Sequence, residues 1–181
     1  MFKRFNKEDF SSNGQVKSSV RRGIRCEILE QYPRLESVMG DIFPQKASVE
    51  VIKIPGHVQV VVLEGEPIFF SLRDGQYFPT LRVLHQYPGF MSEVQVDKGA
   101  IRFVLGGANI MCPGLTSKGG KMEDELPEGT AVAIRAEGKE MELALGLTKM
   151  STTDIREKNK GIAIELIHYV NDGLWRTEFI D

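Results

Sequence analysis

The sequence is poor in the residues that build metal centres and disulfide frameworks. It has two cysteines, Cys26 and Cys112, and three histidines in 181 residues. No cysteine or histidine lies near either cysteine at the short spacing that zinc ligands require, and no mixed set with acidic residues has that spacing. We therefore expect no metal site and no cofactor. Both cysteines are predicted to be buried or half-buried free thiols in a reducing compartment.

Long hydrophobic runs are also missing. No stretch approaches the roughly 18 apolar residues that a membrane span needs. The basic start, MFKRFNKEDF, is not followed by the apolar core of a signal peptide, and Glu8 and Asp9 argue against a transit peptide. The prediction is a cytoplasmic protein with no membrane contact.

Neither sign of charge is in large excess. With 23 basic and 25 acidic residues, the formal net charge is −2. Such a chain has no overall field that would draw it onto nucleic acid, so any contact with RNA would have to come from a local basic face.

The first half of the sequence combines helical and strand patterns. Apolar residues recur at every fourth position over residues 18–32, which predicts a helix that ends at Pro33, and a second stripe predicts a helix over residues 35–43. A short helix is also expected in FPTLRVLHQYP, residues 78–88. Between them, alternation and short turns predict three antiparallel strands, VEVIKI, VQVVVL and IFFSL.

The second half begins with the stretch DKGAIRFVLGGANIMCPGL. Asp97 stands where a helix N-cap is expected, and Gly106 is predicted to be the left-handed residue that closes the helix. The apolar face of this helix is formed by Ala100, Ile101, Val104 and Leu105. A short strand, NIM, and a turn, CPGL, should follow.

The remaining segments predict mostly strands. AVAIRAEG and EMELALGLT alternate as a hairpin, STTDIREKNKG is a helix that opens with a capping box, and IAIELIHYV is a closing strand. Short strands with two helices are typical of a small β-barrel. The predicted fold class is α+β, with a small N-terminal α/β-meander domain over residues 1–91 and a pseudo-β-barrel over residues 92–181.

The glycines of this second half do not form a nucleotide-binding motif. The Walker spacing fails, and no Lys-Ser or Lys-Thr pair follows. The dinucleotide fingerprint also fails, because its glycines open a helix whereas Gly106 and Gly107 follow one.

No catalytic residue is predicted. No histidine lies near Cys112 in sequence to activate it, so a packing role is expected. The carboxylates of EDELPE lie in a polar loop, without apolar neighbours that would shift their pKa.

The placement of the basic residues is more informative than their number. Lys98 and Arg102 are one helical turn apart, Lys118 and Lys121 follow the glycines, and Arg135 and Lys139 flank the predicted hairpin. Basic side chains around a glycine-lined backbone could hold phosphodiester groups. The alternative is scattered charge that only aids solubility.

Three segments resemble the PUA domain, an RNA-binding module: VDKGAIRFVLGGANIMCPGL, AVAIRAEGKEMELALGLTKMSTTDI and GIAIELIHYVNDGLW. With FPTLRVLHQYP in the first half and HYVNDGLW near the end, the whole chain is similar to the malignant T-cell-amplified-sequence family of translation factors. Members of that family join a small N-terminal domain to a C-terminal PUA domain.

The resemblance implies a non-enzymatic factor that binds the small ribosomal subunit. It implies contacts of the PUA domain with ribosomal RNA and tRNA, and a density-regulated-protein partner held largely by the N-terminal domain. The implied roles are release and recycling of deacylated tRNA, reinitiation, and non-standard initiation. The rival hypotheses are an RNA-modification enzyme or its accessory subunit, and a protein–protein adaptor without RNA binding.

The resemblance also implies which residues face RNA. The expected set is Lys98, Gly99, Arg102, Gly106, Gly107, Asn109, Pro113 and Gly114, with Lys118, Lys121 and Lys139 as peripheral phosphate contacts.

Overall fold

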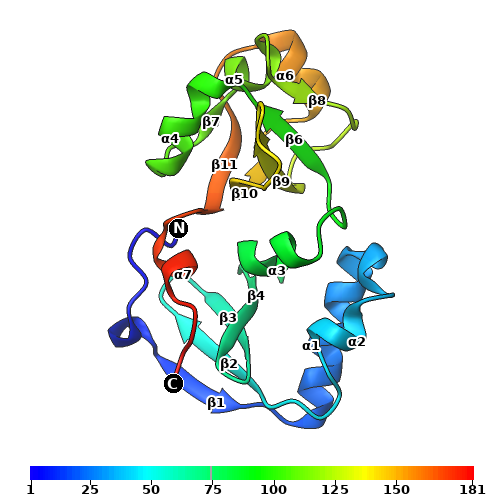
Figure 1. Cartoon of the computed structure of the whole chain (residues 1–181), viewed down its shortest axis with the longest axis vertical. Helices are drawn as coiled ribbons and strands as arrows, with labels where there is room; N and C mark the ends of the chain where they lie inside the picture. Colours follow the sequence, from blue (N-terminus) through cyan, green and yellow to red (C-terminus); the bar gives the residue numbers. More distant parts are fainter. Residues whose placement is uncertain (74) are drawn as a thin grey trace. The chain divides into compact units, whose positions relative to one another are not determined.

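The computed structural model describes residues 1–73 and 75–181, which form two compact units (Figure 1). The N-terminal unit contains residues 5–90 and 176–181, and the C-terminal unit contains residues 1–4 and 91–175. The predicted division at residue 91 put residues 1–4 in the N-terminal domain and residues 176–181 in the C-terminal domain. In the structure residues 1–4 pack with the C-terminal unit and residues 176–181 with the N-terminal unit.

The first residues of the chain are firmly packed in the C-terminal unit. Phe2 is 1% exposed, and its ring meets that of His168 edge-on with 5.9 Å between centroids. The Gly173 N–H donates to the Phe2 carbonyl at 2.6 Å. Sequence periodicity cannot reveal such a contact, because it joins residues about 170 positions apart.

The N-terminal unit contains an antiparallel five-stranded sheet. The strand order is β1 (Ser12–Gln15), β2 (Val49–Ile54), β3 (Val58–Leu63), β4 (Glu66–Ser71) and β5 (Tyr77–Pro79). The predicted meander of three strands is confirmed as β2, β3 and β4. The two edge strands were not predicted, because SNGQ and YFP are short and lack apolar alternation.

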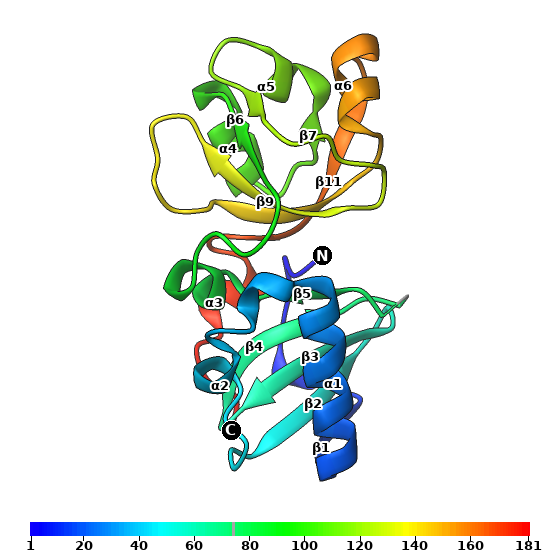
Figure 2. The same cartoon turned by 90° about the vertical axis from the view of Figure 1, so that its right-hand side faces the viewer.

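Three α-helices and two 3-10 turns complete this unit. They are α1 (Ser18–Gln31), α2 (Met39–Ile42), α3 (Leu81–Gln86) and the turns Lys7–Asp9 and Pro33–Leu35. The Tyr32 hydroxyl donates to the Tyr77 carbonyl, and the Tyr77 N–H donates to Gln31 at 2.7 Å, which ties the end of α1 to β5. Figure 2 shows α1 running beside the sheet of this unit.

The helix predicted over residues 35–43 was too long. The structure has the 3-10 turn Pro33–Leu35 and then the single turn α2 in its place. Gly40 lies within α2 itself, and glycine weakens a helix interior, which is consistent with a helix of only one turn. Burial of Leu35, Met39 and Phe43 against the core accounts for the apolar stripe without a continuous helix.

The C-terminal unit is a six-stranded sheet that curls around its core. The strand order is β7 (Ile110–Met111), β11 (Ile162–Tyr169), β10 (Ala144–Thr148), β9 (Ala131–Ala136), β6 (Glu93–Val96) and β8 (Lys121–Met122). Only the β6–β9 pair is parallel. The predicted hairpin, the closing strand and the α+β fold class are confirmed.

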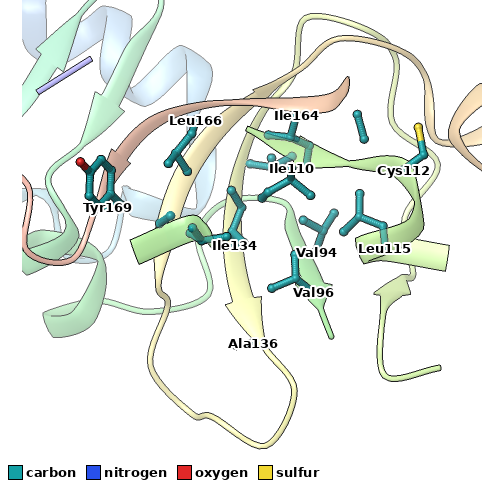
Figure 3. Packing of buried hydrophobic residues seen from close by; sticks show 14 of the residues in the cluster. Val94, Val96, Ile110, Cys112, Leu115, Ile134, Ala136, Ile164, Leu166 and Tyr169 are labelled. Carbon is teal, nitrogen blue, oxygen red and sulfur yellow. The ribbon is translucent and has the colours of Figure 1, made fainter. Parts of the chain in front are cut away.

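The core of this unit is drawn from every strand of the sheet except β8, together with three of its helices. Figure 3 shows side chains of β6, β7, β9 and β11 converging with Cys112 and Leu115 of α5 (Cys112–Thr116), the helix that directly follows β7. Ile134, Ile164 and Val96 are fully buried. This core holds β7 and the helices on either side of it in place, and so positions the candidate site.

Four short helices belong to the second half of the chain, α4 (Ile101–Leu105), α5 (Cys112–Thr116), α6 (Thr152–Lys158) and α7 (Gly173–Arg176), and the 3-10 turn Lys98–Ala100 leads into α4. The cap of α6 is confirmed, since the Ser151 hydroxyl accepts from the Asp154 N–H at 3.1 Å. No helix in the described parts of the chain has both the length and the apolar character to cross a bilayer.

Two local predictions around α4 and α5 were wrong. Gly106 has an ordinary φ of −85°, and the left-handed residue is Gly107, with φ 87°. CPGL is the first turn of α5 and not a loop turn. Proline is compatible with a helix at this place, because the first N–H groups of a helix have no intrahelical acceptor.

Candidate nucleic-acid interface

Asp97 organises the start of the candidate site. Its carboxylate accepts from the Ala100 N–H at 2.9 Å, which is the predicted N-cap, and from the Ser117 hydroxyl at 2.5 Å. Its own N–H donates to the Gly114 carbonyl at 3.1 Å. Asp97 thus joins the turn before α4 to the middle of α5 through its main chain and to the residue after α5 through its side chain, and so fixes the relative position of the two helices.

Lys98 and Arg102 are both exposed on the α4 side of this arrangement. The Lys98 N–H donates to Glu137 at 3.3 Å, while its side chain reaches toward Gly138 of the β9–β10 connection. The Arg102 guanidinium lies 4.7 Å from the ring centre of Phe103. Among the described residues, no carboxylate forms an ion pair with the Lys98 ammonium or the Arg102 guanidinium, so both charges can bind an anion.

The glycines of the site have different structural roles. A Cβ at Gly107 would lie 2.9 Å from the Tyr169 hydroxyl, in a backbone conformation that L-residues rarely adopt, so packing alone requires glycine there. A Cβ at Gly114 would make only ordinary contacts, at 3.8 Å from Ala100 and Ile110. Packing therefore does not explain Gly114, which lines the groove described next.

An open apolar groove of about 660 Å³ lies between α4 and β7. Among the residues that line it, Phe103, Met111 and Ile162 are 55%, 48% and 41% exposed. The predicted residues on its walls are Gly99, Asn109, Pro113 and Gly114. Exposed apolar side chains gathered in this way are a usual mark of a binding site.

The other predicted residues divide into two groups. Lys118 and Lys139 are exposed and form no ion pair among the residues described. Lys121 is paired with Glu123, and the Asn109 side-chain oxygen accepts from the Leu166 N–H at 2.9 Å. Asn109 therefore holds β7 to β11.

Arg135 was grouped in the sequence with the basic residues that could hold phosphate. In the structure its guanidinium lies beside two carboxylates. It lies 2.9 Å from Glu93 and 3.5 Å from the buried Glu142. Burial raises the pKa of Glu93, an effect that the nearby Arg135 guanidinium partly offsets. Arg135 is thus part of the fold of the unit rather than of its basic surface.

The cysteines agree only in part with prediction. Cys112 is fully buried, its thiol lies 3.5 Å from the Lys160 carbonyl, and burial raises the pKa of that thiol. Such a thiol is a poor nucleophile, as expected. Cys26 is exposed on α1, contrary to the expectation that both thiols are at least half-buried.

The described part of the chain offers no cluster of three or more histidine, cysteine or acidic side chains that could hold a metal ion. What the arrangement can provide is recognition. The exposed ring of Phe103 lines the groove, and Lys98 and Arg102, which form no ion pair among the described residues, lie on the same short segment of the chain.

Sequence reasoning missed Phe103, Met111 and Ile162. Phe103 could have been recognised, since it lies off the apolar stripe that contains Val104, beside the basic Arg102. Ile162 could not, because it comes from a strand about 60 residues later and meets β7 only through sheet pairing.

Comparison with known proteins gives a consistent result. The Pre-PUA-like domain model matches residues 5–88, and the PUA domain model matches residues 92–170. Malignant T-cell-amplified sequence 1-B of Xenopus laevis is 50% identical over 179 residues, covering 98% of each chain. The malignant T-cell-amplified sequence 1 homolog of Drosophila melanogaster is 52% identical over 180 residues, again covering 98% of each.

Solved structures support the fold. A hypothetical protein from Pyrococcus horikoshii OT3 aligns with a TM-score of 0.72 at 24% identity, covering 92% of this chain and 99% of that one. A conserved PUA domain protein from Thermoplasma acidophilum aligns with a TM-score of 0.64 at 23% identity, with the same coverage.

These relatives and the PUA domain together support a translation-related role in RNA binding. The identity is near one half, it extends over almost the full length, and both domains match in the same order. The chain therefore belongs to the malignant T-cell-amplified-sequence family.

Proposed function

We propose that this protein is a non-enzymatic, cytoplasmic translation factor that binds the small ribosomal subunit through the face formed by α4, β7 and α5. The bound RNA is ribosomal RNA near the tRNA site and tRNA itself. The outcome is release of deacylated tRNA, with reinitiation and non-standard initiation as related activities. This assignment follows from the family to which the chain belongs and from the chemistry of that face.

The observation that carries the proposal is the combination of unpaired cations with an apolar groove. Lys98, Arg102 and Lys118 can neutralise phosphates, which positions an RNA strand. Phe103 offers an aromatic surface on which an unpaired base can stack, and such stacking contributes about 1–3 kcal/mol per base. A duplex would not expose its bases in this way, so single-stranded or terminal nucleotides fit best.

The two domains have separate tasks in this proposal. Residues 92–181 bind RNA, and residues 1–91 carry most of the surface for a density-regulated-protein homologue. The net charge of −2 is consistent with this arrangement, because RNA binding then depends on one local face and not on the whole molecule.

Reconstituted small subunits loaded with mRNA and deacylated tRNA provide the test. We expect the protein with its density-regulated-protein partner to accelerate tRNA release several-fold, and the protein alone to bind the subunit with a weaker effect on release. Release is measured by filter binding of labelled tRNA. Unchanged release by both preparations would remove the assignment.

The same reactions separate this proposal from its rivals. Mass spectrometry of the nucleosides after incubation should find no new modified base, since a factor that acts by binding leaves RNA chemically unchanged. A modified base would indicate an RNA-modification enzyme or its accessory subunit. Binding to the density-regulated protein without binding to the subunit would indicate an adaptor.

A further inference from the structure

A second basic site lies in the N-terminal unit, outside the face discussed so far. Arg21, Arg22 and Arg25 of α1 meet Gln45 and Lys46 of the following loop around a pocket of about 320 Å³, with the buried ring of Phe43 beside them. Arg22 and Lys46 are exposed and Arg25 is half-buried.

These charges are not neutralised within the described structure. No carboxylate of the described residues forms an ion pair with Arg22, Arg25 or Lys46. The Nε atom of Arg25 is buried and has no hydrogen-bond acceptor among the described residues. A buried donor without an acceptor costs free energy, which a bound ligand that accepts a hydrogen bond would recover.

The position of the cluster is unfavourable for the helix that carries it. Arg21 and Arg22 lie in the N-terminal half of α1 and Arg25 at its middle, the first turn has no acidic residue, and Glu27 and Glu30 follow in the C-terminal half. The helix dipole favours the opposite arrangement. Arg21 and Arg25 are also four residues apart, where like charges repel. The cluster therefore does not stabilise α1, and an anion bound there would relieve both effects.

The loop is held in place to complete the pocket. The Arg21 guanidinium donates to the Ala47 carbonyl at 2.9 Å, which fixes residues 45–47 against α1. The remaining guanidiniums present the planar, forked donors that match phosphate oxygens.

We propose that this pocket binds backbone phosphates of RNA, so that the protein holds RNA through both of its units. The proposal rests on the assignment of RNA as the partner and does not depend on the α4 face. An RNA strand fits better than a single small anion, because the exposed side chains of Arg22 and Lys46 add two further positive charges to the guanidinium of Arg25.

The test uses the full chain and a fluorescently labelled single-stranded RNA of mixed sequence, measured by anisotropy over a range of salt concentrations. The variant Arg22→Glu plus Lys46→Glu should bind the RNA about tenfold more weakly. The slope of the logarithm of its affinity against the logarithm of the salt concentration should become shallower by about one to two. Both side chains are exposed, so folding should be unaffected, and thermal unfolding checks this.

A matched control variant, Lys7→Glu plus Lys53→Glu, makes the same change in charge elsewhere on the N-terminal unit. Equal affinity of the α1 variant and this control would overturn the proposal. Binding of a phosphoserine peptide that the α1 variant loses, with RNA affinity unchanged, would also overturn it in favour of a phosphoprotein ligand.

Combining the α1 variant with Lys98→Glu plus Arg102→Glu separates the two claims. Additive losses support both sites. Loss only with the α1 variant supports the pocket and removes the α4 face. Loss of affinity only with the α4 variant supports the α4 face and removes the pocket.

Discussion

The double charge reversal Lys98→Glu plus Arg102→Glu is expected to weaken binding to purified small subunits about 100-fold at ~0.1 M salt. The estimate takes about 1.5 kcal/mol for each lost charge-assisted contact with phosphate, and each 1.4 kcal/mol corresponds to a factor of ten. Both side chains are exposed and form no ion pair within the described chain, so the free energy of unfolding should change little.

Affinity is measured by co-sedimentation of labelled protein with the subunits, and stability by thermal unfolding. A suitable control is Lys149→Glu plus Lys158→Glu, which makes the same change in charge on the same unit. Those lysines form only exposed ion pairs, with Glu165 at 3.5 Å and Asp154 at 3.7 Å, and such pairs contribute little. Equal binding by the α4 variant and this control would show that the face is wrongly assigned.

The substitution Asp172→Ala should destabilise the C-terminal unit by about 3–5 kcal/mol. The carboxylate of Asp172 is fully buried, lies 2.7 Å from Nδ1 of His168, and accepts from the N–H groups of Tyr169 and Trp175 at 3.1 and 2.8 Å. Removing it leaves buried donors without this acceptor, and breaking a buried pair of this kind has a cost of that size.

Urea unfolding followed by the fluorescence of Trp175 reports on this unit, since it is the only tryptophan of the chain. Asp172→Asn should cost less than Asp172→Ala, because the amide oxygen can still accept from an N–H group. Glu165→Ala, which removes a half-buried carboxylate from the same unit, should cost below about 1 kcal/mol. A loss below about 1 kcal/mol for Asp172→Ala would show that the buried network does not stabilise the unit.

Local patterns predicted the elements that depend on neighbouring residues. The helix α1 and the strands β2, β3 and β4 follow from apolar spacing and from the turns between them. The Asp97 cap was predicted for the same reason, since capping involves residues three apart. Elements that exist only through distant pairing were missed, among them the edge strands β1 and β5.

The glycine and proline errors both concern the ends of short helices. Gly106 and Gly107 are equally able to adopt a left-handed conformation, but the Gly106 N–H still donates to the Arg102 carbonyl at 3.1 Å, so the left-handed residue is the next one, Gly107. CPGL has the composition of a turn, but Cys112 and Leu115 are buried in the core, and this burial favours the helix α5.

Lys98 and Arg102 were grouped because they are four residues apart in the sequence. The structure places Lys98 in the 3-10 turn before α4 and Arg102 in α4, and leaves both exposed. The groove was not predictable, since Ile162 joins it through β11. Sequence position did indicate the difference between two lysines, since the acidic run that begins at Glu123 lies beside Lys121, and Lys121 pairs with Glu123.

The central claim is that RNA of the small subunit contacts the face formed by α4, β7 and α5, and ultraviolet cross-linking tests it most directly. The full chain bound to purified small subunits is irradiated and digested, and the peptides that carry nucleotides are identified by mass spectrometry. We predict cross-links within residues 97–118, with Phe103 among the modified residues, and a loss of these cross-links in the Lys98→Glu plus Arg102→Glu variant. Cross-links that all fall outside residues 97–118, while the protein remains bound, would contradict the claim.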